Sequence, residues 1–144
     1  MRLVLIPKLH RATHAIALAL ASDPALGVTQ AEAHILAHLH ETGETRISDL
    51  HERFGHRRST LTSVLDRLEA RAQITRRSDP DDRRSFLVAL TKQGRTVAAK
   101  VHRALLGLER AALANLSATD RARLADALDA IGESAAGADS RSAY

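Results

Sequence analysis

The stretch Asp79-Pro80-Asp81-Asp82-Arg83-Arg84, followed by Ser85-Phe86-Leu87-Val88-Ala89-Leu90, decides the fold of this chain. Its first half is a charged loop, because Asp and Pro favour turns. Its second half alternates in a way that predicts a strand with Phe86, Val88 and Leu90 on one face. Residues 74–77 are predicted to form the preceding strand, so the whole segment forms a hairpin with arginines at its tip.

Two helices are predicted before this hairpin. The one over residues 57–72 carries apolar side chains at the spacing of a single buried face, namely Leu61, Val64, Leu65 and Leu68. A shorter helix over residues 47–54 precedes it and is ended by Gly55. Two short helices joined by a tight turn and followed by a basic hairpin are typical of a winged helix-turn-helix that binds DNA.

Further helices are predicted on both sides of this block, over about residues 7–21, 29–42, 91–115 and from 117 onward. Thr29 and Glu32 form a capping box at the start of the second of these. The outer helices carry more apolar surface than so small a block can cover, for example at Leu108, Leu124 and Leu128, which we expect to be buried. A second copy of the chain is the expected cover.

The predicted fold is therefore mainly α with a small β-hairpin wing, a winged helix-turn-helix flanked by dimerisation helices. We expect the DNA-binding domain over residues 28–96 and a helical dimerisation region over 1–27 and 97–136. Residues 137–144 are small and polar and are predicted to form a flexible tail.

Composition excludes several classes of protein. With 44% apolar and 26% charged residues, the chain is globular rather than disordered. The absence of cysteine excludes disulfides, thiolate zinc sites and cysteine nucleophiles. The apolar run from Leu3 to Ile6 is too short for a membrane span or a signal-peptide core, so we expect a cytoplasmic protein.

Positive charge is concentrated in the predicted reading elements. The whole chain carries a formal charge of +4, and residues 57–84 alone hold 8 basic and 5 acidic side chains. Because this excess lies on a helix and a hairpin, it indicates a polyanionic partner such as DNA.

These residues also carry a family resemblance. The block from Arg57 to Glu69 resembles the recognition helix of the MarR family of bacterial transcription regulators, and Asp79 to Arg84 with Leu90 to Arg95 resembles its wing. The segments 28–30 and 47–55 also fit, so the resemblance covers about residues 28–96. Two places depart from the pattern: the turn after the recognition helix usually has a glycine but reads Arg71-Ala72-Gln73-Ile74, and His56 stands where a short polar cap is usual.

The resemblance implies a homodimer whose first, fifth and sixth helices interleave at the interface. It implies a recognition helix in the major groove and a wing in the adjacent minor groove of a pseudo-palindromic operator. Family members commonly repress genes near their own, and many release DNA when a small phenolic or anionic effector binds. We therefore predict a homodimeric DNA-binding transcriptional regulator of the repressor type.

The predicted DNA-binding residues lie on the helix face opposite the apolar stripe and in the wing: Arg57, Arg58, Ser59, Thr60, Thr62, Ser63, Asp82, Arg83 and Arg84. Arginine can pair with guanine, and hydroxyls reach bases or phosphates. By resemblance, Arg84 is the minor-groove arginine and Asp82 the acid that orients it. The alternative is an ordinary solvated helix face and a surface ion pair.

Histidines suggest a second kind of site. His34 and His38 share a helix face, as do His10 and His14, and such pairs can hold zinc with two further ligands. A zinc-responsive regulator of the same fold is therefore an alternative, although the match to that branch is incomplete and we assign no metal site or cofactor. The other possibility is an effector pocket lined by His14, His34 or His38.

The sequence disfavours two other functions. An enzyme is disfavoured because the sequence has no phosphate-binding glycine loop, nucleophile elbow or HExxH pattern. A helical interaction module that kept the fold but not DNA binding would tolerate the loss of Arg83 and Arg84, yet both are present.

Overall fold

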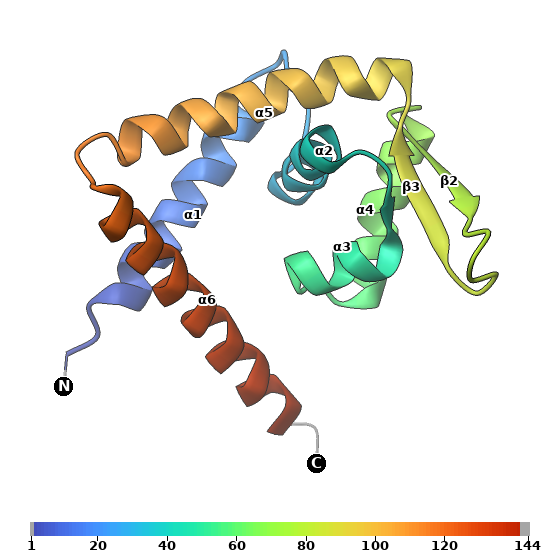
Figure 1. Ribbon diagram of the computed structural model, residues 1–144. Coiled ribbons are helices and arrows are strands. Elements are labelled where there is room, and N and C mark those ends of the chain that lie inside the picture. Colours follow the sequence, from blue (N-terminus) through green and yellow to red (C-terminus); the bar gives the residue numbers. More distant parts are fainter. Residues whose placement is uncertain (1, 142–144) are drawn as a thin grey trace. The chain divides into compact units, whose positions relative to one another are not determined.

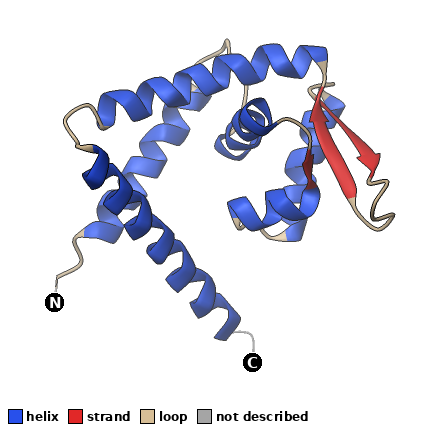
Figure 2. Ribbon diagram, in the orientation of Figure 1, coloured by secondary structure: helices blue, strands red, loops and turns tan. Residues whose placement is uncertain are grey.

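A computed structural model describes the backbone of residues 2–141 and the side chains of residues 2–138. Within these residues it contains six helices and one three-stranded sheet (Figures 1 and 2). The helices are α1 (Leu5–Ala21), α2 (Gln30–Thr42), α3 (Ile47–Phe54), α4 (Arg58–Ala70), α5 (Lys92–Ala112) and α6 (Ala118–Arg141). The chain divides into two compact units, one ending at Ala104 and the other beginning at Leu105. The predicted fold class, mainly α with a small wing, is confirmed.

The wing is an antiparallel sheet with strand order β1-β3-β2. Strands β2 (Ile74–Ser78) and β3 (Phe86–Leu90) form the predicted hairpin. The third strand, β1 (Thr45–Arg46), pairs with β3 and was not predicted, because two residues are too few to show the alternation of a strand. It joins the hairpin to the start of α3.

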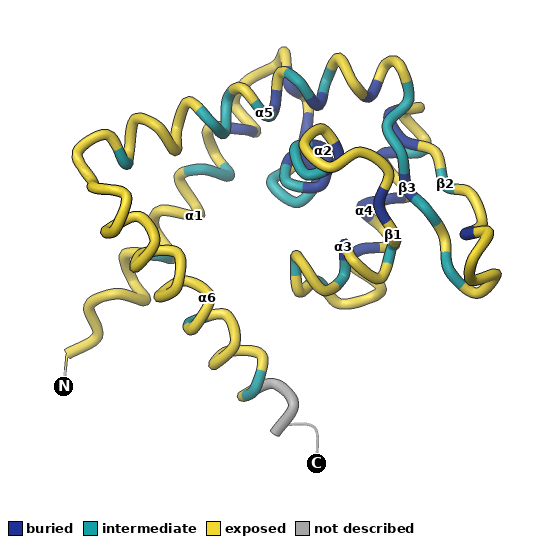
Figure 3. The backbone as a smooth tube through the Cα atoms, in the orientation of Figure 1, coloured by how far each residue is buried: buried dark blue, intermediate teal, exposed yellow. Residues whose placement is uncertain are grey.

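The core of the first unit lies where α2, α3 and α4 meet the sheet. Fully buried aliphatic side chains come from all four of these elements and include Ile35, Leu36, Leu39, Leu50, Leu65, Leu68, Ile74 and Val88. Figure 3 shows the buried positions gathered there. The predicted stripe of α4 is confirmed, and its burial leaves the opposite face of that helix in solvent.

Local signals fix two helix boundaries. The capping box is present at the start of α2, where Thr29 and Glu32 exchange hydrogen bonds. Gly55 ends α3 with a φ of 61°, a left-handed conformation that glycine adopts without strain. Helix α4 therefore starts directly after a tight turn, as a helix-turn-helix requires.

Several apolar side chains are exposed in the single chain. Phe86 is 47% exposed, because it lies at the loop end of the hairpin opposite Ser78. Leu108, Leu124 and Leu128 are 44%, 40% and 44% exposed. Their helices present an apolar stripe that the described chain leaves open to solvent.

The end of α6 also differs from the prediction. The helix continues to Arg141, through the first part of the segment predicted as a tail. Ala135, Ala136 and Ala138 favour this continuation, because alanine has the highest helix propensity. The flexibility expected for residues 137–144 stays a prediction, and residues 142–144 lie outside the described part.

Candidate nucleic-acid interface

The solvent face of α4 carries the predicted reading residues. Arg57 is the N-cap, and the exposed positions that follow are Arg58, Ser59, Thr60, Thr62 and Ser63. The first turn of α4 contains no acidic side chain. This end of the helix therefore combines basic and hydroxyl side chains with backbone N–H groups that favour an anion.

The position of α4 is fixed by a buried carboxylate on α2. Glu32, whose side chain is only 2% exposed, accepts a hydrogen bond from Arg67 Nε at 2.9 Å. Its other oxygen lies 2.6 Å from Arg71 Nη2 and accepts the Thr29 N–H at 3.0 Å. The capping box predicted from the sequence thus also ties α2 to the C-terminal part of α4. The two arginines, 35 and 39 residues further along the chain, gave no local signal of this role.

The electrostatics of Glu32 agree with this arrangement. Burial alone would raise the pKa of its carboxyl, but hydrogen bonds from Arg67, the Thr29 N–H and Arg71 outweigh that effect and lower the pKa below its usual range. The carboxylate therefore stays ionised and paired at neutral pH.

A second cluster ties α4 to β2. Arg76 Nη2 lies 2.7 Å from Asp66 Oδ1, and Arg76 Nε donates to Glu69 Oε2 at 3.0 Å. The hydrogen bond from Arg76 lowers the pKa of the Glu69 carboxyl. Helix α4 and the wing are therefore linked by charge as well as by the core.

The predicted wing arginines stand in solvent. Arg83 is exposed, and the Arg84 side chain is 97% exposed. Asp82 Oδ1 accepts the Arg84 N–H at 3.0 Å, whereas the Arg84 Nε is 3.9 Å away. The structure thus brings Asp82 and Arg84 together chiefly through the backbone, and the guanidinium extends outward.

The prediction missed another acid of the wing. Asp79 is 1% exposed, and its Oδ2 lies 2.7 Å from Nε of Arg46 in β1. Its Oδ1 accepts the Asp81 N–H at 2.9 Å. That backbone hydrogen bond and the charge of Arg46 lower the pKa of Asp79, against the opposing effect of burial. An Asp before Pro suggests a turn, but nothing local identifies Arg46, 33 residues earlier, as its partner.

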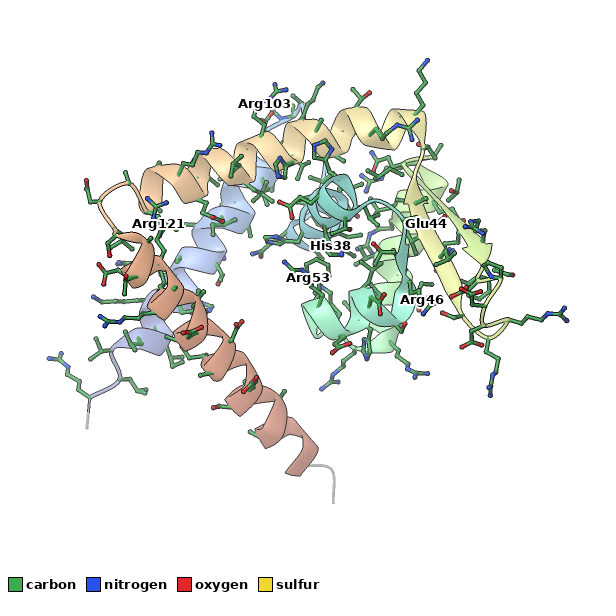
Figure 4. The ribbon with its side chains drawn as sticks, in the orientation of Figure 1. His38, Glu44, Arg46, Arg53, Arg103 and Arg121 are labelled. Carbon is green, nitrogen blue, oxygen red and sulfur yellow. The ribbon has the colours of Figure 1, made fainter. Side chains whose placement is uncertain are left out.

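The histidines proposed for an effector lie in different surroundings on α1 and α2. His38 lines an open pocket of about 480 Å³ together with Thr42, Glu44, Thr45, Arg46, Asp49 and Leu87. Figure 4 labels His38, Glu44 and Arg46 in this part of the first unit. His34 is half-buried elsewhere on α2, and burial, followed by the charge of His56, lowers its pKa. His14 is exposed on α1, where its ring stacks on His10.

The zinc alternative finds no ligand set in the single chain. Among the residues that the structure describes, no group of three or more His, Asp or Glu side chains is placed to hold a metal. His102 instead pairs with Glu41 at 2.9 Å.

In the part of the chain that the structure describes, no helix is both long and apolar enough to cross a membrane.

A helix pair, an exposed basic helix face and a three-stranded wing define the winged helix-turn-helix class of DNA-binding transcriptional regulators. The sequence model of the MarR family matches residues 28–86. A probable transcriptional regulator from Pseudomonas aeruginosa is 30% identical, with 88% of this chain and 96% of that chain covered and a TM-score of 0.70. The chain belongs to the MarR family, as the resemblance of its motifs implied.

Two other comparisons agree. The HTH-type transcriptional regulator YdgJ of Bacillus subtilis (strain 168) is 32% identical over 102 residues, which cover 71% of this chain and 62% of that protein. The chain thus matches less than two thirds of that curated relative. The MarR regulator of Oenococcus oeni PSU-1 has the same fold, with a TM-score of 0.81, 20% identity, and 90% of this chain and 99% of that chain covered. The relatives are regulators rather than enzymes, which is consistent with the expected absence of catalysis.

Proposed function

We propose that this chain is a homodimeric repressor that binds a pseudo-palindromic operator and is released by a small-molecule effector. The observation that carries the proposal is the exposed arginine and hydroxyl face of α4, which lies in the same unit as the exposed wing arginines. Both surfaces suit a DNA duplex. The face of α4 fits the base edges of the major groove, and the wing arginines fit the minor groove between its phosphates.

In the proposed complex, α4 enters the major groove. Arg57 and Arg58 stand at the start of the helix, where a guanidinium can pair with guanine O6 and N7. The hydroxyls of Ser59, Thr60, Thr62 and Ser63 contact bases or phosphates, and the first backbone N–H groups face a phosphate. Because α4 is held by Glu32, these contacts are made by a rigid element.

The wing enters the adjacent minor groove. A narrow minor groove has an enhanced negative potential that attracts arginine. Arg84 is the first candidate because its side chain is almost entirely in solvent, and Arg83 is the second. Asp82 fixes the backbone from which Arg84 extends.

The apolar surfaces of the outer helices support a homodimer. Leu124 and Leu128 of α6 are exposed, and so is the N-terminal apolar run from Leu3 to Ile6. Contiguous exposed apolar surface marks an association site, and a second copy is the commonest partner of a soluble chain. We assign residues 1–27 and 97–136 to this interface.

The names of relatives support repression and effector control. The Bacillus subtilis relative MdtR, 37% identical over 68 residues and matched over 44% of its length, is an HTH-type transcriptional repressor. Regulation of DNA binding by 6-hydroxynicotinic acid is described for BpsR of Bordetella bronchiseptica, which shares the fold at 23% identity and a TM-score of 0.66. Of the proposed effector residues, His38 lines a described pocket.

Selection of DNA sequences by the protein tests the proposed operator. Duplexes are enriched from a random library by the purified protein, and the enriched and starting pools are then compared by fluorescence anisotropy. We expect a pseudo-palindromic sequence, bound by two chains and at least about a thousandfold more tightly than the starting pool. Equal affinity for both pools at fixed salt would contradict the operator and leave only non-specific binding.

A further inference from the structure

We propose that Asp79 is a positioning residue for DNA recognition: its buried carboxylate, held by Arg46, fixes the wing so that Arg83 and Arg84 meet the minor groove. The inference rests on the proposed contact of the wing with DNA. It assigns a separate task to each acid of the loop, because Asp82 acts locally on Arg84 and Asp79 acts on the whole hairpin.

The ion pair between Arg46 and Asp79 spans the three-stranded sheet. Arg46 lies in β1 and Asp79 directly follows β2, and these two strands are the outer neighbours of β3. Arg46 and Arg77 both pair in register with Leu87 of β3. The 2.7 Å contact between Arg46 Nε and Asp79 Oδ2 therefore links the two outer strands over the middle one.

A second ion pair repeats the link. Arg77 Nη2 lies 2.6 Å from Glu44 Oε1, and Arg77 Nε donates to Glu44 Oε2 at 2.9 Å. Glu44 directly precedes β1 and Asp79 directly follows β2, so each ion pair joins a residue beside β1 or in it to one beside β2 or in it. Two opposite pairs thus cross β3 at the end of the sheet that leads into the loop.

The burial of Asp79 distinguishes it from its neighbours. Its side chain is 1% exposed, whereas that of Asp81, two residues later, is 82% exposed. A buried carboxylate is unfavourable unless charge and hydrogen bonds compensate it. Arg46 and the Asp81 N–H supply that compensation, so the position of Asp79 determines where the loop begins.

The negative charge of Asp79 allows a test, because two possible roles of this residue predict opposite changes in the affinity for DNA. An acid close to a DNA groove opposes binding, so its removal alone strengthens the complex with a polyanion. A positioning acid does the opposite, because its loss displaces the cations that it places. Asp79→Asn and Asp81→Asn make the same change in formal charge within the same loop. Asp81 also contacts Arg46, but only at 3.5 Å from Nη2 and with a side chain that is 82% exposed, so the pair separates the buried tie from the exposed one.

The experiment is a titration of the full chain against the duplex enriched by the wild-type protein, at two salt concentrations. We expect Asp81→Asn to leave the affinity unchanged or to raise it. We expect Asp79→Asn to weaken binding about tenfold and to lower the salt slope by about one, as if a wing arginine had been lost. If Asp79→Asn and Asp81→Asn change the affinity for the duplex in the same direction and by the same amount, the inference is wrong.

A second background separates positioning from folding. In a chain that carries Arg83→Ala and Arg84→Ala, the wing has no cation to place, so adding Asp79→Asn should change the affinity less than twofold. A loss that persists there would show that Asp79 acts through the fold, and the inference would be wrong. If Asp79→Asn does not fold, as judged by circular dichroism, Arg46→Lys takes its place, because it keeps the charge but loses the Nε contact to Asp79, with the same expectation in both backgrounds.

Failure of the proposed function is recognised separately. If Arg84→Ala and the double arginine variant bind as the wild type does, the wing does not contact DNA, and both proposals fall. If they bind more weakly while Asp79→Asn matches Asp81→Asn, only the positioning role is lost.

Discussion

Ala72 holds a backbone conformation that glycine would adopt more easily. Its φ is 54°, in the turn between α4 and β2. The turn is kept by hydrogen bonds on both sides, since Ala72 N–H donates to Glu69 O at 2.9 Å and Ala72 O accepts from Thr91 Oγ1 at 2.6 Å. The absence of the family's usual glycine therefore raises the energy of this turn but leaves its backbone conformation the same.

We expect Ala72→Gly to raise the free energy of unfolding by about 1 kcal/mol, because the left-handed conformation brings the alanine Cβ close to a carbonyl oxygen. Ala70→Gly, within α4, should lower it by up to about 1 kcal/mol. Urea denaturation at one fixed protein concentration measures both. Destabilisation by both substitutions would show that Ala72 is not strained.

Arg84 is the wing residue whose removal tests a single contact. Arg84→Ala should weaken operator binding and lower the salt slope by about one, because one phosphate-facing cation is lost. Arg103→Ala, which removes the same charge from the exposed side of α5, is the control and should change the slope less. An unchanged affinity for Arg84→Ala would remove it from the interface.

At the scale of elements, the placement of α4 depends on ties that its own sequence does not show. Hydrophobic spacing was enough to predict its buried face, and so to predict which residues face solvent. The carboxylate that holds it, Glu32, belongs to α2, and its partners are far along the chain. Such pairings depend on how helices pack and leave no periodic signal.

Glu32→Gln should lower the free energy of unfolding at pH 7 by about 1–2 kcal/mol, a value kept small because Arg67 and Arg71 remain partly hydrated. The folded state lowers the pKa of Glu32, so its contribution is complete above about pH 4.3, the usual glutamate value, and is lost as pH falls through the lower folded pKa. The difference between wild type and variant should therefore shrink in acid. Urea unfolding across this range measures it, and a difference that grows in acid would refute the assignment.

The wing shows where prediction from sequence ends. Alternation in residues 85–90 and the Asp-Pro turn identified the hairpin and its exposed arginines. They could not identify β1, which has two residues, or the buried state of Asp79, which depends on Arg46. Alternation puts Phe86 on the same strand face as Val88 and Leu90, but Phe86 is exposed because the end of a hairpin has less of the core beneath it.

At the scale of the whole molecule, the second unit is incomplete as a single chain. Helix α6 exposes Leu124 and Leu128, which share one side of the helix because they are four residues apart. An apolar stripe of this kind is usual in a helix that packs on another. Sequence spacing predicted the stripe correctly, but burial needs a partner that spacing does not supply.

Leu128→Asp should therefore shift the protein toward a monomer and weaken operator binding at least about tenfold, because a charge would enter the proposed interface. Ala122→Asp, on the opposite side of α6, adds the same charge and should leave the assembly unchanged. Sedimentation equilibrium gives the mass of each variant. A dimeric Leu128→Asp protein would place the interface elsewhere.

The loop of the wing also has a consequence for the speed of recognition. Its backbone is held by four internal hydrogen bonds: Asp79 N–H to Ser85 O at 3.0 Å, Asp81 N–H to Asp79 Oδ1 at 2.9 Å, Ser85 N–H to Asp82 O at 2.9 Å, and Arg84 N–H to Asp82 Oδ1 at 3.0 Å. The conformational entropy of this loop is thus lost when the chain folds, and only the arginine side chains remain to be immobilised, at about 0.5–1.5 kcal/mol each. In the proposed complex, the wing meets DNA already shaped, so the association rate is limited by diffusion and orientation rather than by ordering of the loop.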